Sequence, residues 1–276
     1  MSALIDLHMH TTFSDGTLSP AELVRVLAAT TLRLVAITDH DSLDGIAEAK
    51  RELANHPNLT LIPGIELSSD DGASEVHVLG YHLDENDPEL HEVLAAFHRN
   101  REGRGELMVA RLNEMGFDIT WERVVEISQG GVIARPHIAR ALMEKGYVSE
   151  MSEAFDKYIG RGMPAHIERE KMTPEEAVAL IRRFGGVPVL AHPTFTVDPP
   201  ALVASLAKAG LIGMEVYYKN YTPDVVADLK SLADRHNLLA LGGSDYHASG
   251  QSDEVPPGQV GPPEENGQRL LQMGPR

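Results

Sequence analysis

The chain has 276 residues, contains no cysteine, and carries 24 basic against 41 acidic residues, which gives a formal net charge of −17. The lack of cysteine excludes disulfide bonds, thiolate metal sites and cysteine nucleophiles, so any metal must bind nitrogen and oxygen atoms. The negative charge argues against wide binding of duplex nucleic acid or of an anionic membrane. Because the N-terminus lacks a signal-peptide pattern and no run of about 18 apolar residues occurs, we expect a cytoplasmic protein without a membrane partner.

The sequence alternates between strand and helix patterns over most of its length. Strands are predicted at residues 4–10, 32–41, 59–68 and 75–83, with helices at 19–30 and 43–56. Ser19, Pro20 and Glu22 form the pattern of a helix start, with Ser19 as the N-cap. After residue 186, strands at 187–193, 211–218 and 238–247 are separated by helices at 198–210 and 222–237. Such alternation indicates a parallel sheet.

Between residues 87 and 172 the pattern contains helices only. They are predicted at 87–116, 121–128, 135–146 and 149–160. We therefore expect a barrel formed by residues 1–86 and 173–250, with residues 87–172 as an inserted helical cap. Residues 251–276 are rich in proline and glycine and predict a loop-like tail.

Polar side chains gather where the predicted strands end. His8 and His10 lie two residues apart in a strand, so both point to the same face and can bind one ion. The carboxyl ends of parallel strands form one rim, on which α/β folds build their sites. Nine nitrogen and oxygen donors fall on or near this rim, enough for two or three metal ions. They are His8, His10, Asp15, His40, Glu66, His77, His192, Asp245 and His247.

Structural histidines are the alternative to a multinuclear metal site, and the clustering of the donors favours the metal site. Asp39 has two interpretations: it either orients a neighbouring ligand histidine or caps the turn. The histidines outside the motifs are expected to be solvated.

The same motifs resemble those of the PHP (polymerase and histidinol phosphatase) family. The matching stretches span nearly the whole chain: HMH at 8–10 with Asp15, TDHD at 38–41, GIE at 64–66, His77, AHP at 191–193 and GSDYH at 243–247. The resemblance implies an α/β fold, a distorted (β/α)7 TIM-like barrel with an inserted helical subdomain. It also implies three divalent metal ions, manganese first, with iron or zinc as alternatives.

The resemblance further implies how the donors divide among the three ions. By similarity, the first ion binds His8, His10, Glu66 and Asp245. Glu66 bridges to a second ion held by His77 and His192. The third ion binds Asp15, His40 and His247.

Several divalent ions in one pocket suit the hydrolysis of phosphate esters. A hydroxide that bridges two ions can attack phosphorus while the ions neutralise the phosphoryl oxygens, so no catalytic side chain is assigned. Ser68, Ser69 and Ser244 lie near the motifs but lack a positioned base, so a serine triad is not expected. A non-enzymatic metal-binding protein is the alternative of another class. It needs closed coordination, whereas an inserted cap suggests substrate access.

The insert brings arginines into an otherwise acidic protein. Arg135 and His137 open a helix after a Gly-Gly pair, where backbone N–H groups attract anions and a guanidinium group can bind phosphate. Together with Arg104 they are the predicted substrate-binding residues. Arg99 and Arg101 are expected on a solvated helix face.

The RPHIARAL helix within the insert resembles one branch of the family, which includes 3′,5′-nucleoside bisphosphate phosphatases and enzymes acting on 5′-phosphorylated short RNA. This implies release of the 3′-phosphate from a nucleoside 3′,5′-bisphosphate such as pAp. The metals would take the 3′-phosphate and the cap the 5′-phosphate. Short 5′-phosphorylated oligonucleotides are a second expected substrate, and histidinol phosphate is the alternative among phosphatase substrates.

Overall fold

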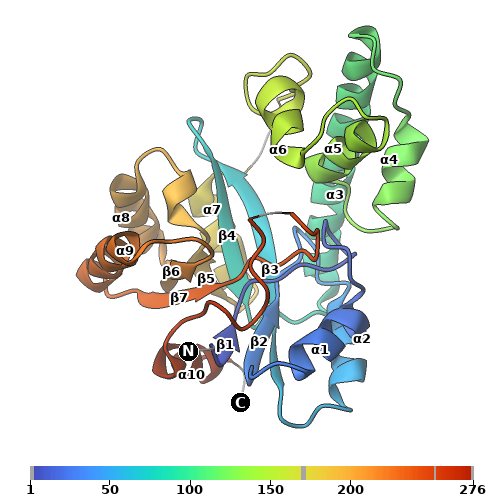
Figure 1. Cartoon of the computed structure of the whole chain (residues 1–276). Helices are drawn as coiled ribbons and strands as arrows, with labels where there is room; N and C mark the ends of the chain where they lie inside the picture. The colour runs from blue at the N-terminus through green and yellow to red at the C-terminus, as the bar shows by residue number, and fades with distance from the viewer. Residues whose placement is uncertain (1–2, 169–171, 252, 275–276) are drawn as a thin grey trace.

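The computed structural model describes residues 3–168, 172–251 and 253–274. Its seven strands (Figure 1) are β1 (Ile5–Asp6), β2 (Leu34–Ile37), β3 (Thr60–Asp70), β4 (Glu75–Tyr81), β5 (Val187–Leu190), β6 (Gly213–Tyr218) and β7 (Leu239–Gly243). The α-helices are α1 (Pro20–Ala28), α2 (Ile46–Leu53), α3 (Pro88–Glu114), α4 (Trp121–Ile127), α5 (Arg135–Glu144), α6 (Met151–Ala154), α7 (Pro174–Arg183), α8 (Pro199–Ala209), α9 (Pro223–Arg235) and α10 (Glu264–Leu271). A π-helix, η1 (Phe155–Ile159), follows α6, and a 3₁₀ turn, η2 (Pro193–Phe195), follows β5.

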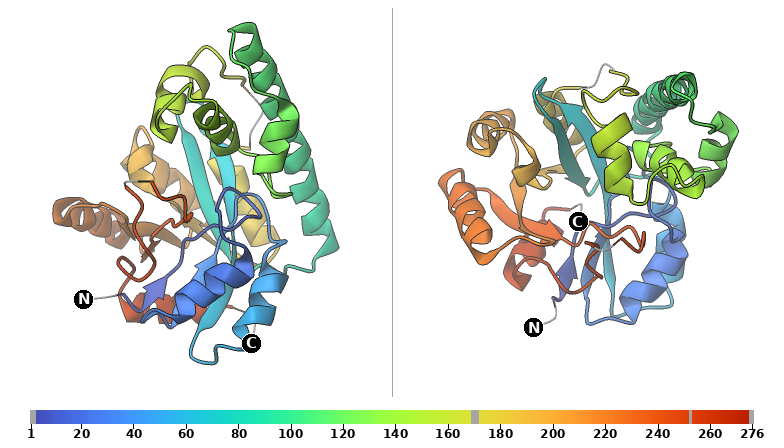
Figure 2. Two further views of the ribbon diagram at one scale, coloured as in Figure 1. Left: turned by 45° about the vertical axis from the view of Figure 1, so that its right-hand side comes forward. Right: turned by 45° about the horizontal axis from the view of Figure 1, so that its top comes forward.

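The strands lie side by side in sequence order, from β1 to β7, and curve into a barrel. The barrel is nearly closed, because the chain after β1 meets the chain after β7. There the backbone N–H of Asp245 donates to the carbonyl of His8 (2.8 Å), and Met9 forms a parallel bridge with Tyr246. Helices surround this sheet, as the right-hand view of Figure 2 shows. The distorted, TIM-like barrel expected from the sequence is confirmed.

One strand departs from the predicted parallel arrangement. β4 runs antiparallel to both β3 and β5, whereas the other neighbouring strands pair in parallel. Parallel strands need a crossover of about a dozen residues, and the four residues 71–74 between β3 and β4 form a hairpin turn instead. The β3–β4 hairpin therefore projects from the barrel toward the insert (Figure 1).

The core of the barrel has two layers. Alternate strand residues such as Ile5, Leu79 and Leu241 form one buried cluster inside the barrel. The intervening residues pack against the surrounding helices, where Leu23 and Leu206 belong to the other buried cluster. This alternation is the period-two pattern of strands covered on both faces.

The helices of the insert begin with α3, which is 27 residues long, and end with η1. They stand above the barrel in Figure 1 and carry a hydrophobic cluster of their own, which includes Met108, Leu112, Ile138 and Leu142. The helices that the sequence predicts between residues 87 and 160 are thus present in the structure. The boundaries chosen for barrel, cap and tail stay a prediction.

The predicted loop-like tail is wrong for residues 264–271, which form α10. Leu270 is fully buried with the strand residues of the barrel interior, and the side chain of Asn266 donates to the carbonyl of Ala240 at 2.9 Å. The neighbouring prolines and glycines dominated the composition and hid a helix of only eight residues.

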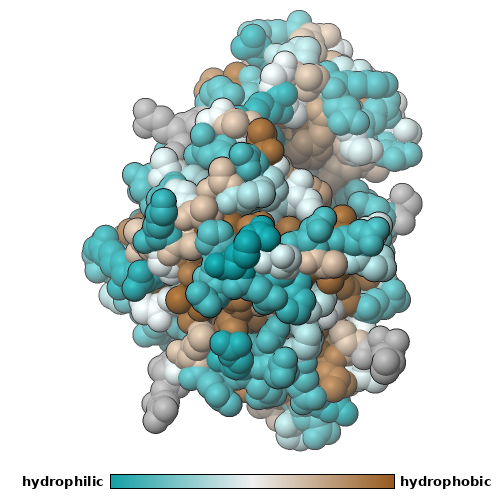
Figure 3. All heavy atoms as spheres, turned by 90° about the vertical axis from the view of Figure 1, so that its left-hand side faces the viewer, coloured by the Kyte–Doolittle hydropathy of each residue, from teal (hydrophilic) through white to brown (hydrophobic). Residues whose placement is uncertain are grey.

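None of the helices formed by the described residues combines the length and apolar character that a membrane crossing requires. In Figure 3 the face that lies to the left in Figure 1 is mostly hydrophilic, with apolar atoms in separate small groups.

Candidate metal centre

The structure brings the nine predicted donors together at the carboxyl-end rim of the barrel. His8 and His10 follow β1, Glu66 lies in β3, and Asp245 and His247 follow β7. The remaining members of the cluster are Asp15, His40, His77 and His192. The side chains are largely removed from solvent, and Glu66 is only 1% exposed.

Glu66 is the centre of this cluster. Its two carboxylate oxygens lie within 3.2 Å of five imidazole nitrogens, and different histidines face each oxygen. They are His8, His10 and His40 at Oε2, and His77 and His192 at Oε1. A carboxylate can bind two cations at once, so this arrangement suits a bridging ligand.

Two further carboxylates stand on either side of Glu66. Asp245 Oδ1 lies 3.2 Å from His10 Nε2 and 3.4 Å from His8 Nε2. Asp15 Oδ1 lies 3.2 Å from His247 Nε2 and 3.7 Å from His10 Nδ1. His10 therefore faces both carboxylates and links the two ends of the cluster.

Three groups of donors among the described residues are each compact enough to hold one metal ion, with ligand atoms within 4.8 Å of one another. They are His8, His10 and Glu66; His40, Glu66 and His77; and His10, Asp15, His40 and His247. The groups overlap with the sets implied by the resemblance, but His10 and His40 each belong to two groups, and Asp245 and His192 belong to none.

Several buried atoms of the cluster face other nitrogen or oxygen atoms at 3.1–3.7 Å without the geometry of a hydrogen bond. They are Nε2 of His8, His10 and His77, Nδ1 of His40, Oδ1 of Asp15 and Oε2 of Glu66. Buried polar atoms in folded proteins are nearly always hydrogen-bonded, and such an atom is costly when it has no partner. Nitrogen and oxygen lone pairs that converge in this way fit divalent cations.

The electrostatics of the cluster also call for cations. Burial alone would raise the pKa of Glu66, Asp15 and Asp245, but the surrounding histidines outweigh burial and hold each pKa well below its usual range. These buried carboxylates are therefore anionic at neutral pH. Burial lowers the pKa of His40 to about 3, so its ring is neutral and offers a lone pair. Burial alone would lower the pKa of His10 and His77, but the neighbouring carboxylates raise these pKa values to about 10 and about 9. Without metal, these imidazoles therefore carry the positive charge that compensates the buried anions, and bound cations would take over that role.

The backbone around two donors is strained. His192 has φ of 25° and Asp245 has φ of 51°, in the left-handed region that costs free energy for any residue except glycine. Gly243 permits the neighbouring close approach, because a Cβ atom there would lie 2.4 Å from the backbone nitrogen of His8. Such strain persists only where the surrounding fold enforces it. Residues away from the cluster, such as Gln129 and Asn237, adopt the same left-handed region.

Asp39 fixes a turn, which was one of its two interpretations, and the hydrogen bonds of its side chain run to the turn at residues 11–14 and not to the neighbouring His40. Its Oδ1 accepts hydrogen bonds from the backbone N–H of Thr11 and the hydroxyl of Ser14, both at 2.7 Å. Its Oδ2 accepts from the Thr11 hydroxyl at 2.6 Å. The Ser14 hydroxyl also lies 3.3 Å from Nδ1 of His10. Asp39 thus fixes the loop that carries Asp15 and reaches a donor histidine through Ser14.

Glu215 is a positioning residue that the sequence interpretation missed. It is fully buried in β6, where its Oε1 lies 3.1 Å from Nδ1 of His8 and its Oε2 accepts from the backbone N–H of His192 at 2.8 Å. Because a carboxylate only accepts, Nδ1 of His8 donates to Glu215, and Nε2 is the ring nitrogen that would bind a cation. The available signal was an acidic residue inside the apolar stretch GMEVYY.

His137 was predicted to bind substrate, and the structure corrects this. Its side chain is 1% exposed, its Nδ1 accepts from the backbone N–H of Ala134 at 3.0 Å, and its ring also hydrogen-bonds to the backbone of Ser14. On the same helix, Nη2 of Arg140 donates to the carbonyl of Asp15 at 2.6 Å. Helix α5 therefore holds the loop that carries Asp15, and His137 serves that contact instead of facing a substrate.

The burial of His137 predicts a pH dependence of stability. Burial lowers its pKa from about 6.5 to about 4, so below pH 6.5 the unfolded chain binds a proton that the folded chain refuses. His137 does not reduce the free energy of unfolding above pH 6.5. As the pH drops to 4, it lowers the free energy of unfolding by about 3 kcal/mol. Urea unfolding of metal-free wild type and His137→Gln at pH 7 and pH 4.5 would measure this. We expect a smaller loss in the variant, and equal losses would contradict the assignment.

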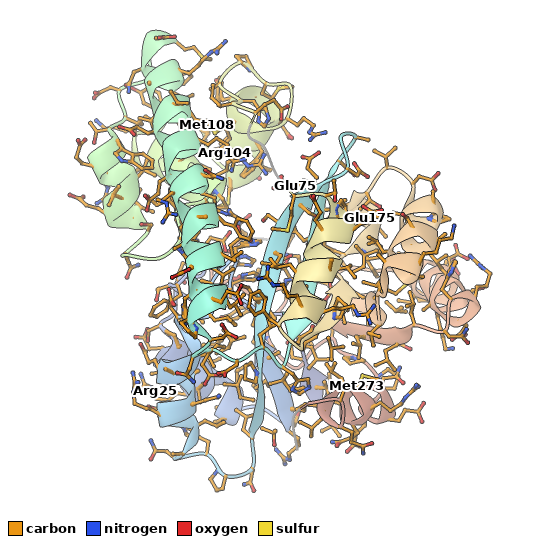
Figure 4. All side chains as sticks on the ribbon, turned by 180° about the vertical axis from the view of Figure 1, so that it is seen from behind. Arg25, Glu75, Arg104, Met108, Glu175 and Met273 are labelled. Carbon is orange, nitrogen blue, oxygen red and sulfur yellow. The ribbon has the colours of Figure 1, made fainter. Side chains whose placement is uncertain are left out.

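The other two predicted substrate-binding residues, Arg104 and Arg135, line one small cavity of about 80 Å³ together with Arg161. Figure 4 shows Arg104 on α3 and Glu75 near the tip of the β3–β4 hairpin. Arg135 forms an ion pair with Glu75, whose Oε1 lies 3.7 Å from Nε2 of His77. This arginine cavity, as we call it, is therefore connected to the donor cluster through Glu75. The sequence pattern did not identify Arg161 as a substrate-binding residue, because it stands in a loop of the insert and outside the predicted helices.

Arg101 is buried, contrary to the expectation of a solvated helix face. It is 5% exposed, its Nε donates to Asp41 Oδ2, and its Nη2 donates to the hydroxyl of Ser68, both at 2.6 Å. Asp41 directly follows the donor His40. The helical periodicity of the insert could not reveal this contact, because it depends on how α3 lies against the barrel.

A larger cavity of about 990 Å³ opens beside the donors Asp15, Asp245 and His247. The sequence interpretation missed its cationic walls, Arg140 and Lys219. Nζ of Lys219 lies 3.1 Å from Asp245 Oδ2. The cavity also has aromatic walls, which are formed by Phe155, Phe195 and Tyr218. Positively charged side chains that can bind phosphate and flat aromatic rings thus line the same cavity next to the cluster.

Comparisons with known proteins match this geometry. The family model described as PHP domain matches residues 6–170. The chain is 36% identical over 252 residues to the 5′-3′ exoribonuclease Rnm of Salmonella typhimurium, covering 89% of this chain and 86% of the relative. It is 33% identical over 267 residues to the 3′,5′-nucleoside bisphosphate phosphatase of Chromobacterium violaceum, covering 92% and 93%. A solved structure from Bifidobacterium adolescentis, assigned as a metal-dependent phosphoesterase, is 30% identical, has a TM-score of 0.89, and covers 99% and 96% of the two chains.

Proposed function

The chain belongs to the PHP domain family of metal-dependent phosphoesterases, and from this premise we propose that it releases the 3′-phosphate of nucleoside 3′,5′-bisphosphates. Its relatives are hydrolases of phosphate esters, which identifies the chain as a phosphoesterase. The identity of its substrate is what we propose. The relative from Chromobacterium violaceum is named for this substrate class. The observation that carries the proposal is the arginine cavity, which lies one carboxylate away from the donor cluster.

We propose three divalent ions, with manganese as the first choice, in the donor cluster. The buried ring nitrogens of His8, His10, His40 and His77 and the carboxylates of Asp15 and Glu66 support cation binding. When bound, such ions neutralise the phosphoryl oxygens and lower the pKa of the attacking water. The chain itself orients the donors, through Glu215 at His8 and through Asp39 and Ser14 at His10.

A second phosphate distinguishes the proposed substrate from an ordinary monoester. Arg135 and Arg161 are each held by one carboxylate, Glu75 and Asp70 respectively, and Arg161 also donates to the carbonyl of Gly72 at 3.0 Å. A guanidinium has five N–H donors, so one such pairing leaves donors for phosphate. With Arg104 in the same cavity, the arginines provide a site for the 5′-phosphate while the 3′-phosphate occupies the donor cluster.

Short 5′-phosphorylated oligonucleotides are proposed as further substrates. The cavity of about 990 Å³ beside Asp245 reaches the upper end of the range for small-ligand pockets, about 300–1,000 Å³, so it has room for more than one nucleotide unit. The relative from Salmonella typhimurium is named as an exoribonuclease.

Histidinol phosphate is the competing substrate. It carries a single phosphate and would leave the arginine cavity without an anion, so the structure favours it less. The non-enzymatic alternative is overturned, because the relatives that match over most of this chain are hydrolases.

A substrate panel on manganese-loaded protein tests the proposal. It comprises a nucleoside 3′,5′-bisphosphate, the matching 3′- and 5′-monophosphates, histidinol phosphate, and a trinucleotide with and without a 5′-phosphate. We expect the highest kcat/KM for the bisphosphate, with the nucleoside 5′-monophosphate as product. A higher kcat/KM for histidinol phosphate, or equal values for bisphosphate and 3′-monophosphate, would overturn the proposal.

A further inference from the structure

Phe195 is a large apolar side chain that the fold leaves open to solvent. It ends η2, the short turn after the donor His192, and is 60% exposed. Its ring lies 5.0 Å from the ring of His192 and meets Tyr218 almost perpendicularly, at 5.8 Å between centroids. Aromatic side chains of this size are usually buried. Here the turn that carries a metal donor presents an aromatic ring at the wall of the large cavity.

A second aromatic ring, Phe155, lines the same cavity from the insert. Phe155 begins η1, a π-helix, and such turns often mark functional sites. The guanidinium carbon of Arg135 lies 5.3 Å from the centre of its ring. Arg135 also lines the arginine cavity, so the contact between Phe155 and Arg135 joins the walls of the two cavities.

We propose that the large cavity binds the base of a nucleotide, with Phe195 as the stacking surface and Phe155 as a second aromatic wall. This inference rests on the proposed function and names a part of the substrate that the phosphate sites do not recognise. Any base has a flat π-face, so stacking on an aromatic ring needs no fixed hydrogen-bond pattern. The cavity adjoins the donors Asp245 and His247, so a ribose can connect a base there to a phosphate at the cluster.

The charged side chains of the cavity are mixed, because Asp156, Asp253 and Glu254 line it as well as Arg140 and Lys219. Arg140 and Lys219 line it close to the donor cluster, where the nucleotide carries its phosphate charge. Phe195, in contrast, is joined by ring contacts to His192 and Tyr218, and Met151 adds a further apolar wall. A flat uncharged group therefore fits against the aromatic wall while anionic groups remain beside the cations.

Phe195→Ala tests the base site, with Phe195→Trp as the variant that should restore it. Val197→Ala is the matched control, because Val197 is also exposed, at 70%, and stands two residues further in the same loop. The substrates are adenosine 3′,5′-bisphosphate and 1-deoxyribose 3,5-bisphosphate, which carries the same phosphates without a base. In wild type we expect a kcat/KM ratio of about 5 to 100 in favour of the base. The ratio should fall toward one in Phe195→Ala, and stay unchanged in Val197→Ala.

Binding supplies a readout that is independent of turnover. Calorimetry with adenosine 5′-monophosphate and ribose 5-phosphate measures whether the base adds affinity in each variant. A base-dependent gain that disappears in Phe195→Ala and returns in Phe195→Trp would support the site. An unchanged gain in Phe195→Ala would overturn it. If wild type hydrolyses neither bisphosphate faster than p-nitrophenyl phosphate, the proposed function fails instead, and calorimetry alone decides whether the base site exists.

Discussion

Glu66→Gln is expected to lower the metal content of the protein more than the removal of any single histidine of the cluster. Glu66 faces five imidazoles with two oxygens, so a bridging role makes one residue responsible for two ions. Glutamine keeps the size of the side chain but removes the charge and one acceptor oxygen. A metal site contributes several kcal/mol of transition-state stabilisation, so phosphatase activity should fall by about 1,000-fold or more.

Metal analysis of protein produced with manganese measures this difference. His77→Ala is the comparison, because His77 contacts the Oε1 side of Glu66 only, and it should remove fewer ions per chain. His236→Ala controls for general effects of histidine loss, since His236 ends α9 away from the donors. Circular dichroism and thermal unfolding confirm that each variant folds. If Glu66→Gln retained as much metal as wild type, or if wild type held fewer than two ions, the bridging assignment would be wrong.

The donor cluster was predictable because a barrel brings residues that are distant in sequence close together at the ends of its strands. His8, Glu66 and Asp245 are far apart in sequence, yet each stands at or near the carboxyl end of a predicted strand. Parallel strands bring such ends to one rim, so residue type and strand position were sufficient to group them. The sequence did not predict as well how the donors divide among the ion sites. His40, for example, belongs to two groups, and this depends on side-chain geometry.

The positioning residues were not predictable in the same way. Glu215, Arg101 and His137 are buried polar residues whose partners lie on other elements of the fold. Periodicity tells which face of a helix is apolar, but it does not tell whether an arginine on the polar face meets a carboxylate such as Asp41. Phe195 presents the opposite difficulty, because an aromatic residue in a sequence suggests burial and only the structure shows it exposed.

These buried contacts have a common effect, which is to tie the insert to the donors. Arg101 on α3 holds Asp41 next to His40, and Arg140 on α5 holds the carbonyl of Asp15. His40 and Asp15 both belong to the group of donors formed by His10, Asp15, His40 and His247. The insert is therefore more than a cover over the rim, since it fixes part of the donor cluster and presents the arginine cavity at the same time.

Arg135→Ala is expected to reduce kcat/KM for a nucleoside 3′,5′-bisphosphate far more than for the matching 3′-monophosphate. Arg135 lines the arginine cavity, and a charge-assisted hydrogen bond to the 5′-phosphate would be lost only on the substrate that carries that phosphate. Removing such a donor from a partly desolvated cavity costs about 2–4 kcal/mol, or about 30- to 1,000-fold in kcat/KM. Steady-state kinetics with both substrates, together with the metal content of each protein, measure the effect.

The ion pair between Arg135 and Glu75 makes a second variant necessary. Glu75 Oε1 lies 3.7 Å from Nε2 of His77, so a loss of Arg135 can also disturb the donor cluster through Glu75. Such a disturbance would lower kcat/KM equally for both substrates, and Glu75→Gln combined with Arg135→Ala should relieve it. Arg123→Ala, which removes an exposed arginine of α4, controls for the change in net charge. A loss confined to the bisphosphate that persists in the double variant supports the phosphate site. Equal losses that the double variant relieves would place Arg135 in support of the metal centre, and no loss on either substrate would remove the reason to prefer a bisphosphate over histidinol phosphate.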